Sequence, residues 1–181
     1  MVAWPLTRGN PAEAQQPLKM PRLGMLWPGA PPDKWDEALR QGLRTHGYVE
    51  SRNILLEYRW AEGKQERLPE LAEELVRLKV DLIVTISAPA ILAVKKATTE
   101  IPIVFAGTSD PVRSGFVSSL ARPGGNLTGL SLMAPDLAAK RLELIKSIAP
   151  AASRVAMLWN ASDEGMAIRV NEAQLLLLRC K

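Results

Sequence analysis

Short apolar runs recur along the chain at intervals of roughly 20–30 residues, a spacing typical of strands separated by helices. Four of the runs are almost entirely apolar, as expected for parallel strands that are covered on both faces. The run at residues 54–60 alternates between apolar and charged positions instead, which predicts an edge strand. The six runs lie at residues 23–27, 54–60, 82–86, 103–106, 127–132 and 155–159.

Helical patterns fill the gaps between these runs. The first gap carries apolar residues at helical spacing, after a Pro-Pro-Asp start signal at residues 31–33 and before Gly47 as a stop signal. Further helices are predicted over residues 68–76, 90–99, 114–121 and 135–148. The residues expected to face inward are Trp35, Ala38, Leu39 and Leu43 in the first helix and Leu137, Leu144, Ile145 and Ile148 in the last.

Strands that alternate with helices predict an α/β fold with a parallel sheet and right-handed crossovers. Residues 22–132 hold five strands, and a flavodoxin-like, doubly wound order of 2-1-3-4-5 places the alternating second strand at an edge. Residues 133–181 are expected to begin a second α/β lobe that is incomplete. Because the chain ends just after the apolar run 175–178, with no terminator, the sequence is expected to be truncated.

The N-terminal segment differs from the rest of the chain. Residues 1–21 contain four prolines and show no hydrophobic periodicity. The triplet Ala12-Glu13-Ala14 fits the small-x-small pattern that precedes a signal-peptidase cut, although no apolar segment of the usual 7–15 residues comes before it. By itself, the pattern favours a disordered tail over the remnant of an export signal.

Composition and charge exclude several further classes of function. The chain has 181 residues, of which 47% are hydrophobic and 23% charged, and its formal net charge is +4. The sequence contains no block of five or more Lys and Arg residues, so it does not indicate a nucleic-acid partner. One histidine and one cysteine, Cys180, leave little material for a metal site. The most apolar stretch, residues 80–94, is shorter than the about 20 residues of a transmembrane helix, so the chain is not expected to span a membrane.

The candidate ligand-binding residues lie in three loops that follow the first, third and fourth predicted strands. In open α/β sheets, ligands bind beyond the carboxyl ends of the strands, where the strand order reverses. Each loop is rich in small residues, proline or hydroxyl groups and leads toward a helix N-terminus, whose free N–H groups favour an anion. The loops comprise Trp27, Gly29 and Ala30; Ser87, Ala88, Pro89 and Ala90; and Thr108, Ser109 and Asp110.

These loops offer groups for a carboxylate, an ammonium and an apolar side chain, although each residue also has an ordinary structural explanation. A carboxylate fits Ser87 and the amides near Ala90, with Thr108 or Ser109 as hydroxyl donors, and Asp110 fits an ammonium group. Ser and Asp after a strand are equally common as N-caps and turn formers. Trp27 either packs against an apolar part of the ligand or belongs to the core.

Signatures of enzymes are missing from the sequence. Gly24 and Gly29 have the outer spacing of a P-loop, but Ala30-Pro31 follows in place of Lys and Ser or Thr. The first turn lacks the dinucleotide-binding pattern, and Ser131 is not in a nucleophile elbow. His46 stands next to Gly47 and is expected to be a cation near a helix end. We therefore predict a binding protein without catalytic residues, metal or cofactor.

Several longer strings resemble the substrate-binding proteins of ABC transporters, in the group that includes tryptophan- and tyrosine-binding members. The most specific is ARPGGNLTG at residues 121–129, and IPIVFAGTSDPV precedes it at residues 101–112. Similar strings lie at residues 42–50, 140–146 and 154–160. Residues 1–16 also resemble the end of this family's export signals, which reverses the preference stated above for a disordered tail.

The resemblance implies a type I periplasmic binding protein, with two α/β lobes that close on a small ligand. The protein would deliver an amino acid or similar solute to an ABC permease and its ATPase. It would be periplasmic or otherwise extracytoplasmic if an export signal lies upstream, and cytoplasmic if not. The matching strand ends would line the cleft, together with Asn160 from the second lobe. Family members are nearly twice as long as this chain, so weak binding and exposed apolar surface at residues 142–148 and 175–178 are expected.

Two alternatives remain open at this stage. The same fold could serve as a ligand-sensing module coupled to a kinase or a repressor, although no kinase segment or DNA-binding motif is present. A small flavodoxin-like enzyme would need a flavin or nucleotide site, and the first turn shows none.

Overall fold

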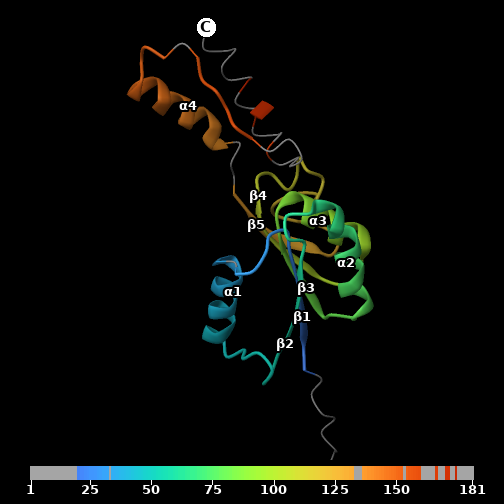
Figure 1. Cartoon of the computed structure of the whole chain (residues 1–181). Helices are drawn as coiled ribbons and strands as arrows, with labels where there is room; N and C mark the ends of the chain where they lie inside the picture. Colours follow the sequence, from blue (N-terminus) through green and yellow to red (C-terminus); the bar gives the residue numbers. More distant parts are fainter. Residues whose placement is uncertain are drawn as a thin grey trace, which may run out of the picture.

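A computed structural model describes residues 20–32, 34–132, 136–152 and 154–159, together with Met166, Val170, Asn171 and Gln174. Its centre is a parallel sheet in the order β2-β1-β3-β4-β5, as predicted (Figure 1). The strands are β1 (Arg22–Trp27), β2 (Leu55–Trp60), β3 (Leu82–Ile86), β4 (Ile103–Thr108) and β5 (Leu127–Ser131). The helices are α1 (Lys34–Thr45), the 3₁₀ turn η1 (Gln65–Arg67), α2 (Leu68–Arg77), α3 (Ala88–Ala97) and α4 (Asp136–Ile148).

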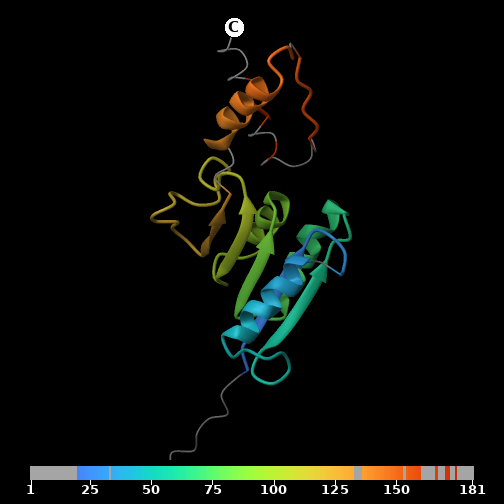
Figure 2. The ribbon, with the colours of Figure 1, turned by 90° about the vertical axis from the view of Figure 1, so that its left-hand side faces the viewer.

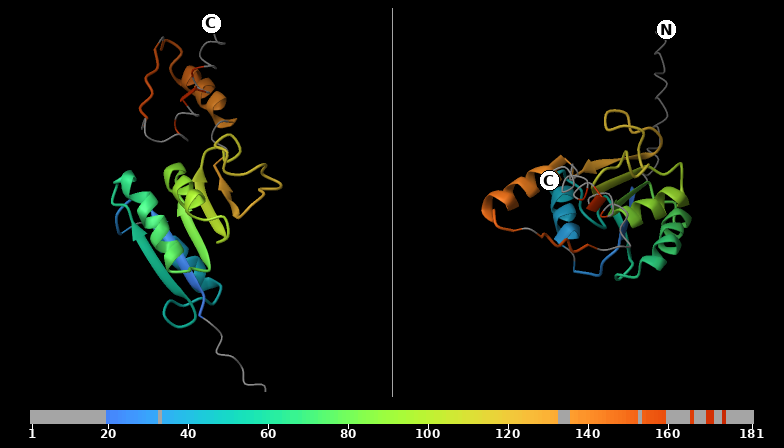
Figure 3. Two further views of the ribbon diagram at one scale, coloured as in Figure 1. Left: turned by 90° about the vertical axis from the view of Figure 1, so that its right-hand side faces the viewer. Right: turned by 90° about the horizontal axis from the view of Figure 1, so that it is seen from above.

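One face of the sheet is covered over β1, β3 and β4 by α2 and α3, which lie in front of these strands in Figure 3, left. Side chains of alternate strand positions, such as Leu26, Ile83 and Phe105, are buried there in one cluster with the apolar stripe of α2. The sheet and α2 approach closely because Gly24 has no side chain: a Cβ at Gly24 would lie 3.1 Å from both Leu75 and Val80. This helix-covered face is the main core of the molecule.

The other face is covered by α1 alone. Of the predicted inward stripe of α1, Leu39 and Leu43 are half-buried against β1 and β2, whereas Trp35 and Ala38 are exposed. Trp27 is buried on this face, with its ring centroid 6.2 Å from that of Trp60 on the edge strand β2. In Figure 2, α1 crosses in front of β1 and β2, and no described helix lies in front of β4 and β5.

Two predicted elements are wrong. Residues 154–159 form no strand and are exposed, because no described strand lies beside them to complete a ladder of hydrogen bonds. Residues 114–121 form no helix: the chain turns over residues 110–117, with the N–H groups of Phe116 and Val117 bonded to the Pro111 carbonyl. Gly115 adopts a φ of +68°, which ends any right-handed helical path at that point.

The remaining helices occur close to where the sequence placed them, with two differences. The third helix begins two residues early, at Ala88, since Ser87 is its N-cap and Pro89 is tolerated in its first turn. Three of the residues predicted to face inward in the last helix do not: Leu144, Ile145 and Ile148 are exposed, and α4 lies beyond the carboxyl ends of the strands (Figure 1). The side chain of Leu137 lies outside the described residues. The apolar surface expected in residues 142–148 is thus present in part, whereas residues 175–178 lie outside the described residues.

The first prediction concerns Gly129 in β5. A Cβ at this position would lie 2.0 Å from the carbonyl oxygen of Phe105, so Gly129→Ala forces β5 away from β4. We expect the free energy of unfolding to fall by at least about 2 kcal/mol, measured by urea denaturation. Gly42→Ala is the control, because nothing lies within 4 Å of a Cβ there. In the interior of α1 it is expected to stabilise by about 0.5–1 kcal/mol, and an equal loss in both variants contradicts the β4–β5 pairing.

Candidate functional site

The three loops singled out by the sequence lie at one edge of the sheet. Parallel pairing aligns Leu26 with Thr85, and Ile86 with Ala106. The residues that follow β1, β3 and β4 therefore emerge side by side, on strands about 4.8 Å apart. This is the edge where the strand order reverses, because β1 lies between β2 and β3.

Ser87 connects β3 to α3 in a strained conformation. Its φ of +70° and ψ of 150° belong to a region that side-chain-bearing residues rarely adopt. Its carbonyl accepts the first helical hydrogen bond, from the N–H of Ile91 at 3.1 Å. Its hydroxyl caps no N–H group of the helix and is buried without a hydrogen-bond partner. Strain and an unpartnered polar group at one residue are typical of functional positions.

Two further polar atoms at the same edge are buried without partners. They are the hydroxyl of Thr108, at the end of β4, and the indole N–H of Trp27, at the end of β1; both residues are only 2% exposed. Leaving a buried donor or acceptor unpaired costs about 1–3 kcal/mol. Three such atoms on three adjacent strand ends are the strongest sign of a binding site in the described structure.

The other predicted residues play mixed roles. The side chains of Ala88 and Ala90 are buried in the core, so only the main-chain groups of these two residues remain as candidates for ligand contact. Asp110 uses Oδ1 as a turn cap, accepting from the N–H groups of Val112 and Arg113 at 3.1 and 3.0 Å. The Ser109 carbonyl accepts a hydrogen bond from the Ser131 hydroxyl at 3.3 Å. Whether these residues contact a ligand stays a prediction.

The loop after β1 is held to the loop after β2 rather than to the other two. The carbonyl oxygens of Pro28 and Gly29 accept hydrogen bonds from the N–H groups of Gly63 and Glu62, at 2.8 and 2.9 Å. Ala30 is exposed. Asn160 lies outside the described residues.

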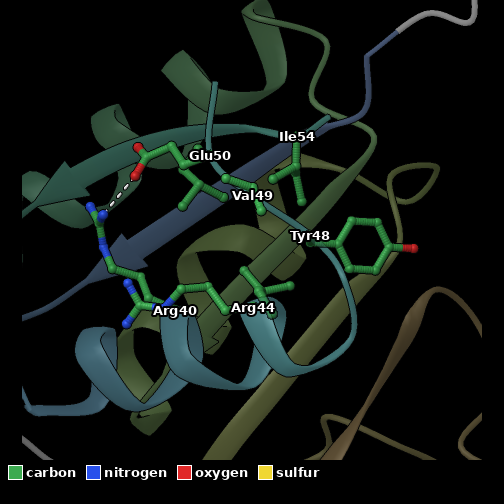
Figure 4. Close-up of a pocket in the computed structure, with 8 residues that line it drawn as sticks. Arg40, Arg44, Tyr48, Val49, Glu50 and Ile54 are labelled. Atoms are coloured by element: carbon green, nitrogen blue, oxygen red, sulfur yellow. Dashed lines mark hydrogen bonds and ion pairs between the residues drawn. The ribbon is translucent and has the colours of Figure 1, made fainter. Parts of the chain in front are cut away.

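The arginine-rich hollow shown in Figure 4 lies at the opposite, amino end of the sheet. It measures about 130 Å³, and its Arg40 is already paired, with Glu50 at 2.6 Å and Asp36 at 3.2 Å. Arg40 also lies over the Tyr58 ring, 5.0 Å from the centroid. Burial raises the pKa of the Tyr58 phenol well above its usual range, and the Asp36 carboxylate raises this pKa further. These charges serve the packing of α1 on β2, so the hollow offers no free cation.

The most specific of the strings that carry the family resemblance, residues 121–129, also lies away from the candidate site. Asn126 precedes β5 and donates two hydrogen bonds, to the carbonyl oxygens of Thr98 and Ile101 at 3.2 and 2.7 Å. Gly124 and Gly125 both adopt a φ of +69°, which lets the chain turn into β5. The string therefore ties the start of β5 to the end of α3, a structural role that its specificity in sequence did not reveal.

Two negative findings apply to the described residues. They contain no group of three or more His, Cys, Asp or Glu side chains that could hold a metal ion. None of their helices is long and apolar enough to cross a membrane.

Comparisons with known proteins identify the family of this chain. Residues 31–179 match the ABC transporter substrate binding protein family. The tyrosine-binding protein of Clostridioides difficile is 34% identical over 140 residues, which are 77% of this chain and 40% of that protein.

Solved structures with the same fold are also similar to this chain in sequence. A conserved domain protein from Vibrio cholerae O1 superposes with a TM-score of 0.82 at 29% identity, over 89% of this chain and 54% of that one. The ABC domain from Streptococcus pneumoniae in complex with L-Trp superposes with a TM-score of 0.78 at 26% identity, over 88% of this chain and 54% of that one. The chain thus spans about half the length of these relatives, and its five-stranded sheet corresponds to one lobe of a type I periplasmic binding protein. This chain belongs to the family of ABC transporter substrate-binding proteins.

Proposed function

We propose that this chain is the first lobe, with the start of the second, of a binding protein that delivers an amino acid to an ABC importer. The observation that carries the proposal is the set of three buried, unpartnered polar atoms on the ends of β1, β3 and β4. They lie at the edge where open α/β sheets bind their ligands. Relatives named for tyrosine binding, or solved with L-Trp, support an amino acid as the solute.

The chemistry at the end of β3 suits the carboxylate of that amino acid. The first N–H groups of α3 have no acceptor within the helix, and the helix dipole favours a negative charge at this end. Ser87 and Thr108 add two hydroxyls without partners in the protein, and each hydroxyl hydrogen turns by rotation about the Cβ–Oγ bond. These donors together replace the water that a carboxylate loses on binding.

The second lobe would supply the remaining contacts, including Asn160. Residues 133–181 are proposed to be its beginning, in agreement with the position of α4 beyond the strand ends. Closure on a ligand needs two lobes and a hinge, so this chain by itself is expected to hold an amino acid with a Kd of about 1 mM or weaker. The permease of an importer is the proposed direct partner, and the ATPase that drives the permease is the proposed indirect partner.

Titration with L-tryptophan and L-tyrosine tests the proposal. In ¹H–¹⁵N NMR spectra of the full chain at millimolar ligand, we expect amide shifts confined to Gly29, Ser87, Ala88, Ala90 and Thr108–Asp110, because those groups form the carboxyl edge of the sheet. L-tryptophan amide lacks the carboxylate and is expected to bind at least about tenfold more weakly, since charge-assisted hydrogen bonds are lost. Shifts that gather around Arg44 and Tyr48, or no shift with any of the twenty amino acids, contradict the site.

Thr108 allows a sharper test. Thr108→Val removes a hydroxyl that has no partner within the protein, so stability is expected to be unchanged or slightly higher while the tryptophan shifts weaken. Thr85→Val is the matched control: the Thr85 hydroxyl is equally buried but donates to the Leu26 carbonyl at 2.9 Å. That substitution is expected to lower the free energy of unfolding by about 1–3 kcal/mol. If Thr108→Val destabilises as much and leaves the shifts unchanged, Thr108 has a structural role only.

A further inference from the structure

A second hollow lies between the last turn of α3, the chain that follows β4 and the turn that enters β5. It measures about 350 Å³ and is lined by residues 95, 99, 115–118 and 123–127. Small-molecule sites in proteins measure about 300–1,000 Å³. Lys95 lies about two turns of α3 beyond Ser87, or about 12 Å along the helix. This hollow, which we call the Lys95 hollow, is therefore separate from the carboxyl edge of the sheet.

The Lys95 hollow contains a positive charge that no carboxylate neutralises. Among the described residues that line it, Lys95 alone is charged. Its half-buried side chain donates a hydrogen bond to the Gly115 carbonyl, and it forms no ion pair with the described part of the chain. The arginines of the hollow in Figure 4 differ, because Arg40 and Arg44 are each paired with an acidic side chain. An ammonium has three N–H groups, so Lys95 retains both charge and donors for a ligand.

The turn into β5 adds main-chain donors to the same hollow. Gly124 and Gly125 both adopt a φ of +69°, and within the described residues their N–H groups donate no hydrogen bond. The turn is closed instead by the N–H of Ser118, which donates to the Pro123 carbonyl at 2.8 Å. Successive free N–H groups in a turn form a concave site for an anion, and hydrogen bonds to an ionised acceptor are roughly twice as strong as neutral ones.

The remaining lining residues select among anions. Phe116, Val117 and Leu127 are buried apolar residues that line the hollow. An inorganic anion gains nothing from this apolar part, whereas an organic anion buries apolar surface there. No described Asp or Glu lines the hollow to accept an ammonium group, and the charge of Lys95 repels one. The Lys95 hollow therefore disfavours amino acids, which carry an ammonium beside their carboxylate.

We propose that the Lys95 hollow binds a small carboxylic acid that has an apolar tail and no ammonium group. The carboxylate accepts hydrogen bonds from the Lys95 ammonium and from the N–H groups of Gly124 and Gly125. The tail packs on Phe116 and Leu127. The three unpartnered polar atoms at the strand ends take no part, so this proposal stands independently of the proposed amino-acid site.

Titration of the full chain with phenylacetate tests the proposal. In ¹H–¹⁵N NMR spectra, we expect amide shifts at Gly115, Gly124, Gly125 and Asn126, with a Kd of about 1 mM. The neutral analogue 2-phenylethanol lacks the carboxylate and is expected to bind at least about tenfold more weakly. Inorganic phosphate lacks the tail and is expected to bind at least about threefold more weakly.

Neighbouring lysines provide a matched pair of variants. Lys95→Met removes the charge inside the hollow and is expected to weaken phenylacetate binding at least about tenfold. Lys95→Arg keeps a cation there and is expected to stay within about threefold of the unmodified chain. Lys96→Met is the control, because Lys96 is exposed and does not line the hollow, so the same loss of charge is expected to change the Kd less than about twofold. Circular dichroism checks that all three variants keep the fold.

Four results overturn the proposal. Equal binding of phenylacetate and 2-phenylethanol shows an apolar hollow without selectivity for an anion. Equal losses in Lys95→Met and Lys96→Met show an effect of overall charge only. Shifts with phenylacetate at Ser87 and Thr108 place the acid at the carboxyl edge of the sheet, and the absence of shifts at millimolar phenylacetate shows that the hollow binds no such acid.

Discussion

The parallel pairing of β1 with β3 is the interaction on which the rest of this structure depends. It moves β2 to the outer edge and aligns Leu26 with Thr85, so that the strand ends at Trp27, Ser87 and Thr108 emerge side by side. The pairing is held from one face by α2 and α3, whose apolar stripes bury alternate residues of every inner strand. The binding edge is thus a consequence of how the sheet is wound, and the loops contribute the chemistry.

The polar side chains differ between the amino and the carboxyl ends of the strands. Toward the amino end, Asn126 bonds two carbonyl oxygens and Arg40 is paired with two carboxylates. The Tyr58 hydroxyl and Asp36 Oδ1, beside Arg40, are also buried without partners, but they do not lie together on adjacent strand ends. At the carboxyl end, Ser87 is strained, and hydroxyl and indole groups are buried without partners. An unpaired buried polar group is costly unless a ligand supplies the missing bond, which explains why the end with the less satisfied side chains is the better candidate for binding.

The two faces of the sheet are covered unevenly, which leaves apolar side chains partly exposed on one face. A lobe whose second face is only partly covered has apolar area left for another polypeptide surface, and α4 beyond the strand ends has an apolar stripe of its own. Both features agree with a chain that spans about half the length of its solved relatives.

The sequence by itself determined the strand order, four of the five predicted helices and the three loops at the carboxyl edge, because hydrophobic periodicity reports which residues are buried and parallel strands share a direction. It could not show that residues 154–159 lack a strand partner, or that Gly115 turns the chain where a helix was expected. Nor could it separate the core positions of Ala88 and Ala90 from the unpartnered hydroxyls of Ser87 and Thr108. Those distinctions depend on which atoms meet across segments far apart in sequence, and only the tertiary structure decides them.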